Sequence, residues 1–203
     1  MKRLVIIGAS ALGRETVGYA QDCGMDVRGF LDSRKDILDG YAGYPPVLGT
    51  VEGFRPEADD VFICALGEPE QKRKYVTLLG AVEWTNVVHP TAVVGQNVRL
   101  GKGCIVRPFA VIGNDAVLGD HVTVGTQSLV AHDCMIGDFS VVSPGAHIAG
   151  WCRIAAGSFL GIHSAVVPRV ELGTDHGVFV AAGAVVTKST NAVRVMGVPA
   201  KEG

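Results

Sequence analysis

Two kinds of hydrophobic pattern divide the 203-residue chain. Up to about residue 86, short apolar runs alternate with longer segments of mixed polarity. The pattern predicts strands over residues 3–9, 26–32 and 59–67, and helices over residues 13–24 and 68–80. Strands that alternate with helices are typical of βαβ units around a small parallel sheet. We therefore expect residues 1–86 to form an N-terminal α/β domain of the Rossmann-like kind.

From residue 88 the period of the apolar positions changes to six. Val, Leu or Ile occupies fifteen successive positions at this spacing, from Val88 to Leu172. Such a hexapeptide repeat is the signature of a parallel β-helix, which we expect over residues 87–203. The register shifts after Leu172, where LGTDHGVF is two residues too long, so we expect a loop at one corner of the coil.

A second column of the repeat lies four residues after each aliphatic and holds only Ala, Val, Cys or Ser, from Ala92 to Val170. Small side chains at this position fit a narrow interior. Cys104, Cys134 and Cys152 fall in this column, so we expect buried spacers rather than nucleophiles or metal ligands. Glycine often follows the aliphatic directly, where we expect the corner to tolerate little bulk.

Composition and charge narrow the class of protein. The chain is 48% apolar with a formal net charge of −2, which argues against disorder and against nucleic-acid binding. The apolar run at the N-terminus stops at Gly8, too short for a signal peptide or a membrane span. The five cysteines form no CxxC pair, which fits thiols in a reducing compartment. We therefore expect a cytoplasmic protein without a membrane partner.

One repeat carries a pair of polar residues that suits acid–base chemistry. In LVAHDCMIG, His132 and Asp133 lie between two aliphatic core positions. Three hexapeptides complete one coil, so residues 18 apart stack, and His132 is expected on the outer wall between Asn114 and Gly150. Histidine suits a general base because its unperturbed pKa is about 6.5, and a carboxylate can orient the ring. A solvated polar pair would explain the same residues.

A weaker motif follows the first predicted strand. In GASALG, Gly8 and Gly13 bracket a turn, and the N-terminus of the next helix can accept a phosphate. Asp32 ends the second predicted strand, where a Rossmann-like site contacts a ribose hydroxyl. NAD binding is an alternative interpretation, but the motif is not GxGxxG and the domain is small for a dinucleotide.

Taken together, GASALGRE, AHDCMIGD and the terminal GVPAK resemble the bacterial NeuD/PglD-type sugar acyltransferases, over nearly the whole chain. The resemblance implies a left-handed β-helix, a homotrimer, and acetyl-CoA as co-substrate in the groove between neighbouring subunits. It further implies transfer of the acetyl group to an amine, often at C4, of a UDP- or GDP-linked amino-dideoxy sugar. The N-terminal domain would hold the nucleotide, and no metal is expected.

The resemblance also assigns roles to particular residues. His132 aligns with the catalytic base, and Asp133 with the acidic residue that follows it, which is commonly glutamate in the family. The positions that match cofactor-binding residues are Gly150, Ile162, Ala182, Gly183 and Lys201. The positions that match substrate-binding residues are Gly8, Ser10, Gly13, Asp32, Gly67 and Arg73.

Three other functions share parts of this pattern. An O-acetyltransferase of the same architecture would attack with a sugar hydroxyl instead of an amine. A hydratase of the γ-carbonic anhydrase type would need zinc and two histidines five residues apart, a spacing that no pair of the six histidines has. A non-catalytic trimer that binds nucleotide sugars would keep the fold without the chemistry.

Overall fold

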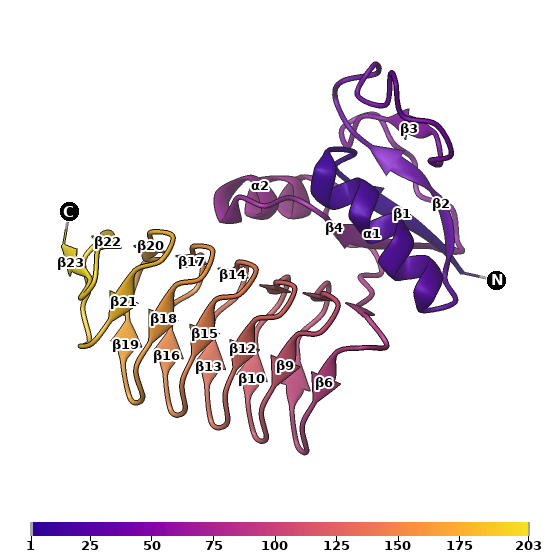
Figure 1. Cartoon of the computed structure of the whole chain (residues 1–203). Helices are drawn as coiled ribbons and strands as arrows, with labels where there is room; N and C mark the ends of the chain where they lie inside the picture. The colour runs from indigo at the N-terminus through magenta and orange to yellow at the C-terminus, as the bar shows by residue number, and fades with distance from the viewer. Residues whose placement is uncertain (1, 203) are drawn as a thin grey trace.

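The N-terminal part of the chain folds around a four-stranded parallel sheet, as the computed structural model shows for the described residues 2–202 (Figure 1). Its elements are β1 (Arg3–Ile7), α1 (Ala11–Asp22), β2 (Asp26–Leu31), β3 (Val47–Gly49), β4 (Asp60–Cys64) and α2 (Pro69–Leu79). The strand order is β3-β2-β1-β4. The edge strand β3 was not predicted, because its three residues follow a proline-rich loop and carry no alternation.

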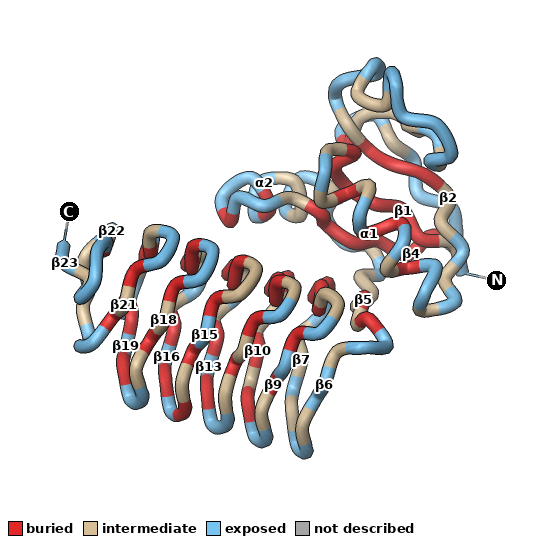
Figure 2. The backbone as a smooth tube through the Cα atoms, in the orientation of Figure 1, coloured by how far each residue is buried: buried red, intermediate tan, exposed pale blue. Residues whose placement is uncertain are grey.

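Both faces of this sheet are covered, which explains why its central strand β1 and the neighbouring β4 are apolar at nearly every position. Leu4, Ile6 and Phe30 pack in the cluster that includes Val17 and Ala20 of α1. The alternate strand residues, such as Val5 and Phe62, pack in the cluster that includes Tyr75, Val76 and Leu79 of α2. Figure 2 shows β1 and β4 buried along most of their length.

The C-terminal part of the chain is a parallel β-helix with three faces. Face 1 consists of β5 (Val87–Val88), β8 (Ile105–Val106), β11 (Thr123–Val124), β14 (Val141–Val142), β17 (Phe159–Leu160), β20 (Phe179–Val180), β22 (Arg194–Met196) and β23 (Lys201–Glu202). Face 2 consists of β6 (Val93–Val94), β9 (Val111–Ile112), β12 (Leu129–Val130), β15 (His147–Ile148), β18 (Ala165–Val166) and β21 (Val185–Val186). Face 3 consists of β7 (Arg99–Leu100), β10 (Val117–Leu118), β13 (Met135–Ile136), β16 (Arg153–Ile154) and β19 (Glu171–Leu172). We name the corners by the faces they join: corner 1/2, corner 2/3 and corner 3/1.

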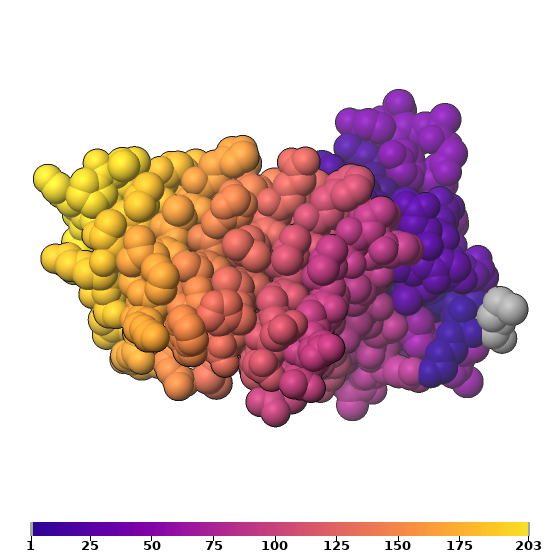
Figure 3. All heavy atoms as spheres, turned by 60° about the horizontal axis from the view of Figure 1, so that its bottom comes forward, coloured from indigo at the N-terminus to yellow at the C-terminus, as the bar shows by residue number. Residues whose placement is uncertain are grey.

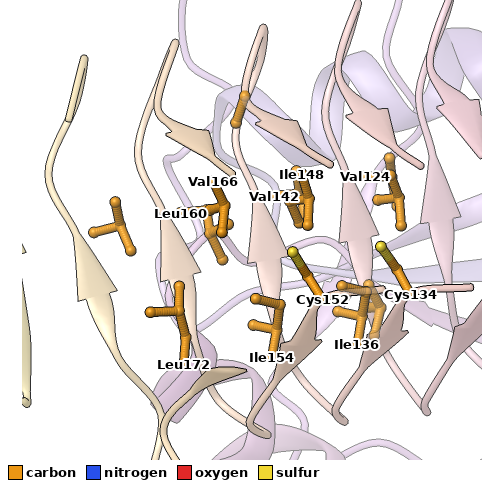
Figure 4. Close-up of a cluster of buried hydrophobic side chains, with 14 of the residues drawn as sticks. Val124, Cys134, Ile136, Val142, Ile148, Cys152, Ile154, Leu160, Val166 and Leu172 are labelled. Atoms are coloured by element: carbon orange, nitrogen blue, oxygen red, sulfur yellow. The ribbon is translucent and has the colours of Figure 1, made fainter. Parts of the chain in front are cut away.

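The stacking of the coils follows the expected spacing of 18 residues. Val130 pairs with Ile112 on one side and with Ile148 on the other. The aliphatic column is buried from Val106 onward, and Cys134 and Cys152 lie in the same interior (Figure 4). In the first coil the aliphatic column is less buried, because no preceding coil covers it: Val94 is 41% exposed. The predicted fold class is confirmed: a small βαβ domain followed by a left-handed parallel β-helix.

The glycines that follow the aliphatics leave no room for a side chain, as expected, and the structure shows why. A left-handed backbone occurs three residues after each aliphatic in most coils, often at residues other than glycine, such as Asp133 and Trp151. The glycines directly after the aliphatics instead allow close approach of the next coil: a Cβ on Gly113 would lie 2.5 Å from the backbone nitrogen of His132. Backbone contact between coils, rather than the corner itself, therefore excludes a side chain there.

The two parts of the chain are joined by buried contacts. Trp84 forms a parallel bridge with Phe62 in the N-terminal sheet, whereas Val87 pairs with Ile105 in the β-helix. Lys72 of α2 is fully buried and donates hydrogen bonds to the carbonyl of His121 (2.9 Å) and to Oγ1 of Thr123 (2.8 Å).

Burial lowers the pKa of Lys72 to about 8. The hydrogen bonds of this side chain fix α2 beside the coils, and Figure 1 shows α2 above them. In the view with the bottom of Figure 1 brought forward, the coils follow one another in chain order toward the C-terminal end (Figure 3). Among residues 2–202 no helix has the length and apolar character that crossing a membrane requires.

Candidate active site

His132 and Asp133 occupy corner 2/3, directly after β12. Nδ1 of His132 lies 2.8 Å from Oδ2 of Asp133, and the two side chains are 48% and 42% exposed. Asp133 has a left-handed backbone (φ 58°), and its amide donates to the carbonyl of Asn114 (3.0 Å). This fixed corner lets the short aspartate side chain reach the ring. The other ring nitrogen, Nε2, forms no hydrogen bond with any residue from 2 to 202, so it is available as an acceptor when the proton is on Nδ1.

Gly150, on the next coil, lies directly against this ring. A Cβ atom at position 150 would come within 2.6 Å of Cε1 and 2.8 Å of Nε2 of His132. The amide N–H of Gly150 donates to no carbonyl or side chain of the described residues 2–202. Position 150 is therefore a glycine because the ring of His132 occupies the space of a side chain, and it offers an uncommitted N–H beside the imidazole.

Trp151 completes the surroundings of the imidazole and was missed in the sequence. Its ring meets that of His132 edge to face, with centroids 4.4 Å apart and planes at 88°. The guanidinium of Arg169, one coil further, lies 4.4 Å from the Trp151 ring centroid. Counting 18 residues from Asp133 to Trp151 and again to Arg169 reveals the column that brings the three together. Such an aromatic contact restricts the orientation of the His132 ring.

The predicted cofactor-binding residues divide between separate places in one chain. Ile162, Ala182 and Gly183 lie at corner 1/2, where the amide of Gly183 donates to the carbonyl of Ile162 (2.8 Å) and the Ile162 side chain is 51% exposed. Gly150 lies at corner 2/3, across the width of face 2. Lys201 lies in β23, exposed at the C-terminal end of face 1. Within one chain the structure brings only Gly150 to His132.

The glycine turn after β1 forms one wall of a hollow of about 240 Å³ in the N-terminal part. Gly8 has a left-handed backbone (φ 93°), and a Cβ on Gly13 would lie 1.9 Å from the carbonyl oxygen of Gly8, so both positions require glycine. Ser10 is the N-cap residue of α1, and its side chain makes no capping hydrogen bond. The exposed start of α1 is therefore open to an anion.

Asp32 forms the opposite wall of the same hollow, and its side chain is only 6% exposed. Oδ2 accepts from the amide of Ala9 (3.0 Å), while Oδ1 accepts from the amide and Nε of Arg34 (3.0 and 3.1 Å). Burial raises the pKa of Asp32, but the hydrogen bonds from Arg34 and Ala9 outweigh burial and hold the pKa below its ordinary value. The carboxylate is thus charged and fixed at the carboxyl end of β2.

Two further predicted residues lie around α2. Gly67 is exposed in the loop between β4 and α2. Arg73 points away from the hollow between Gly8 and Asp32 and toward the β-helix, with its guanidinium 5.3 Å from the Phe139 ring centroid. The α2 side chains that line the hollow of Asp32 are Gln71 and Tyr75, which the sequence did not single out.

Comparison with known proteins gives consistent matches to both parts of the chain. The model of the PglD N-terminal domain matches residues 3–79, and the model of the bacterial transferase hexapeptide (six repeats) matches residues 115–150. The acetyltransferase domain of PglB from Neisseria gonorrhoeae FA1090 is 30% identical, with all of both chains covered and a TM-score of 0.87. The same domain has been solved in complex with acetyl coenzyme A.

PerB from Caulobacter crescentus, in complex with CoA and GDP-perosamine, is 29% identical with a TM-score of 0.86, covering 99% of this chain and 97% of PerB. A curated relative, the uncharacterized protein L142 of Acanthamoeba polyphaga mimivirus, is 26% identical over 98 residues, or 48% of this chain. The match spans about a fifth of the length of L142 (20%).

The fold and the corner site define an acyltransferase built on a hexapeptide-repeat β-helix. The chain belongs to the NeuD/PglD-type family of sugar acyltransferases, and within it to the sugar N-acetyltransferases.

Proposed function

We propose that this protein transfers the acetyl group of acetyl-CoA to the amine, at C4, of a UDP- or GDP-linked amino-dideoxy sugar. Residues 1–86 bind the nucleotide, and residues 87–203 carry out the transfer in the cytoplasm. The observation that carries the proposal is the His132–Asp133 pair against Gly150 on an exposed corner of the β-helix. The complexes of the two relatives, one with acetyl coenzyme A and one with CoA and GDP-perosamine, support the choice of substrates.

The hydrogen bond from His132 to Asp133 defines the roles of the two ring nitrogens. With Nδ1–H donated to Oδ2, Nε2 carries the free electron pair. The neutral sugar amine attacks the thioester carbonyl carbon with its nitrogen lone pair, and Nε2 takes one proton from that nitrogen as the carbon–nitrogen bond forms. Asp133 stabilises the resulting imidazolium, as a triad carboxylate does.

Gly150 supplies a hydrogen-bond donor for the second part of the reaction. As the amine attacks, the carbonyl oxygen becomes negatively charged, and the uncommitted N–H of Gly150 can stabilise it. When the intermediate collapses, the carbon–sulfur bond breaks and the CoA thiolate takes the proton held by His132. The products are the amide of the sugar and free CoA, and His132 returns to its starting form.

The separation of the cofactor-binding residues supports assembly into a homotrimer. The outward side chains of face 2 are largely apolar, and Val93 and Val111 are 59% and 37% exposed in the single chain. Face 2 is flanked by the corner of His132 on one side and the corner of Ile162 on the other. In a ring of three chains that covers face 2, corner 2/3 of one chain lies beside corner 1/2 of its neighbour. Acetyl-CoA then lies between Gly150 of one chain and Ile162, Ala182 and Gly183 of the next.

The nucleotide has its own binding surface in each chain. The hollow between Gly8 and Asp32 contains a carboxylate for the ribose hydroxyls, and α1, whose N-cap is Ser10, begins just after Gly8 and offers its N-terminus to a phosphate. Gly13 lies in the first turn of α1, and Gly67 follows Leu66, which lines the hollow. Arg73 faces Phe139 and Lys201 lies in β23, both outside this hollow.

The direct test is turnover on defined acceptors. The protein is incubated with acetyl-CoA and a panel of UDP- and GDP-linked 4-amino-dideoxy sugars, with free CoA as the readout and the product identified by mass. The matched 4-hydroxy sugars serve as the control, because they accept an acetyl group only in O-acetylation. Transfer to an amine and not to the matched hydroxyl is expected. Release of CoA with the hydroxy sugars only would contradict the proposal. Absence of CoA release with every amino sugar tested would also contradict it.

A further inference from the structure

The indole of Trp151 occupies a position whose backbone does not suit a bulky side chain. Residues 97, 115, 133, 151 and 169, which we call the apex column, take the same place at corner 2/3 of five successive coils, and all have a left-handed backbone with φ between 58° and 63°. Asn97, Asp115 and Asp133 are residue types that tolerate this backbone, whereas a bulky residue such as Trp151 is an outlier there. The indole is also 48% exposed, so it adds little to the core. An unfavourable conformation that folding does not require points to a functional role.

Trp151 is held against the ring of His132 by its backbone and by its side chain. Its amide donates to the carbonyl of His132 (3.1 Å), which fixes the two corners in register. Its ring then meets the imidazole edge to face, with centroids 4.4 Å apart. The imidazole is further bound to Asp133 through Nδ1 and lies against the backbone of Gly150. Asp133 restrains one ring atom and Gly150 has no side chain, so the indole is the bulky group that restricts rotation of the imidazole.

Arg169 holds the indole from the next coil. The guanidinium carbon lies 4.4 Å from the centroid of the Trp151 ring, within the range of a cation–π interaction. The amide of Arg169 donates to the carbonyl of Gly150 (3.0 Å), which fixes this coil in register as well. Within residues 2–202 the guanidinium forms no ion pair that would draw it away from the indole. Arg169, Trp151 and His132 therefore form a chain of contacts across three successive coils.

We infer that Trp151 is a positioning residue for His132, and that Arg169 acts on His132 through Trp151. The inference rests on the proposed function, in which Nε2 of His132 takes a proton from the attacking amine. A base must lie within hydrogen-bond reach of that proton, and a displacement of about 1 Å can lower the rate roughly 10²-fold. By restricting rotation of the imidazole, the indole keeps Nε2 in the productive position. Such a residue affects kcat and leaves the affinity for acetyl-CoA unchanged.

The first test compares substitutions within the apex column of the full-length protein. Trp151→Gly removes the indole where glycine is unstrained, and kcat with a nucleotide-linked amino sugar is expected to fall roughly tenfold, with the KM for acetyl-CoA within about twofold of wild type. Trp151→Phe keeps an aromatic ring and should recover most of the rate. Asn97→Gly makes the matching change two coils before Asp133 and is the control, which should keep the wild-type kcat. A melting curve establishes that each variant is folded.

The role of Arg169 is tested in two backgrounds. Arg169→Gln removes the cation and should lower kcat roughly two- to threefold in otherwise wild-type protein. In Trp151→Gly the same substitution should have no further effect, because Arg169 acts through the indole. Arg169→Lys keeps a cation and should lie closer to wild type. An equal loss from Arg169→Gln in both backgrounds would overturn this part of the inference.

A second readout on His132 does not need turnover. Diethyl pyrocarbonate modifies accessible neutral imidazoles, and the rate at His132 is followed by mass spectrometry of its peptide. The rate should rise several-fold in Trp151→Gly and stay near wild type in Trp151→Phe and Asn97→Gly.

The two readouts separate the failure of this inference from that of the proposed function. In an active enzyme, an unchanged kcat in Trp151→Gly, or a loss that appears only in KM, would overturn the inference and leave acetyl transfer standing. If the wild-type protein acetylates no amino sugar, the proposed function fails and the modification rate decides whether the indole restrains the ring. Equal rates at His132 in wild type and Trp151→Gly would then overturn the inference.

Discussion

Gly150 and His132 lie on adjacent coils in direct contact, and a Cβ atom on Gly150 would come within 2.6 Å of Cε1 of the ring. Gly150→Ala should therefore displace the imidazole while leaving the coil intact, since the backbone of Gly150 is not left-handed. We expect kcat to fall roughly 10- to 100-fold with little change in thermal stability. Steady-state kinetics and a melting curve measure the two effects. Gly18→Ala, where a Cβ meets no atom within 4 Å, is the matched control and should retain full activity.

Asp133 should act only through His132. Asp133→Asn keeps a residue that tolerates the left-handed backbone at φ 58° but loses the charge that favours the protonated ring. A fall in kcat of roughly tenfold or more is expected, with the KM for acetyl-CoA unchanged. In a His132→Ala background the same substitution should cost nothing further, because the two residues form one unit. If Asp133→Asn lowered kcat equally in wild-type protein and in His132→Ala, Asp133 would have a role independent of His132.

The assembly should depend on face 2 and not on face 3. Val111→Lys places a charge on the apolar face 2, so we expect loss of the trimer and, with it, loss of acetyl transfer. Met135→Lys places the same charge on face 3 at a side chain that is 44% exposed, and should leave both unchanged. Light scattering coupled to size exclusion gives the oligomeric state. An active monomer of Val111→Lys would contradict the two-chain active site.

His121 should make the protein less stable in acid. Its buried ring stacks on Phe139 and meets Trp84 edge to face, and burial lowers its pKa to about 4. An unfolded chain binds this proton near pH 6.5, so between pH 6.5 and 4 the unfolded state holds more protons and the free energy of unfolding falls as the pH drops. The expected loss is on the order of 2 kcal/mol by pH 4. Urea denaturation across this range should show a weaker pH dependence in His121→Asn, and an unchanged dependence would contradict the argument.

The β-helix could be predicted almost completely because each coil repeats the same physical requirement. Val130 must fill the interior and Cys134 must be small, and both follow from a spacing of six. The same arithmetic places His132 and Ile162 at different corners, because the 30 residues between them make five hexapeptides, which is not a multiple of three. Trp151 could have been found by counting 18 residues from Asp133.

The site residues on α2 that could not be predicted from the sequence depend on packing between the two parts of the chain. The docking of Lys72 onto His121 and Thr123 determines which side of α2 faces the hollow between Gly8 and Asp32. That docking turns Gln71 toward the hollow and Arg73 away from it. The helical pattern of α2 carries no information about this choice, since both residues are polar. Strand β3 was missed for a local reason, because three residues are too few to show a period.

The most direct test of the account is the turnover of His132→Ala on a nucleotide-linked amino sugar, with His176→Ala as the control. His176 also pairs with an adjacent aspartate (Nδ1 2.9 Å from Oδ1 of Asp175), but it lies in the loop after β19, away from corner 2/3. If Nε2 of His132 removes the proton from the attacking amine, His132→Ala should lower kcat roughly 10²- to 10⁴-fold. Acetyl-CoA binding, measured separately by calorimetry, should stay within about twofold of wild type, and His176→Ala should remain active. Wild-type turnover by His132→Ala would remove the imidazole from the mechanism and contradict the central claim.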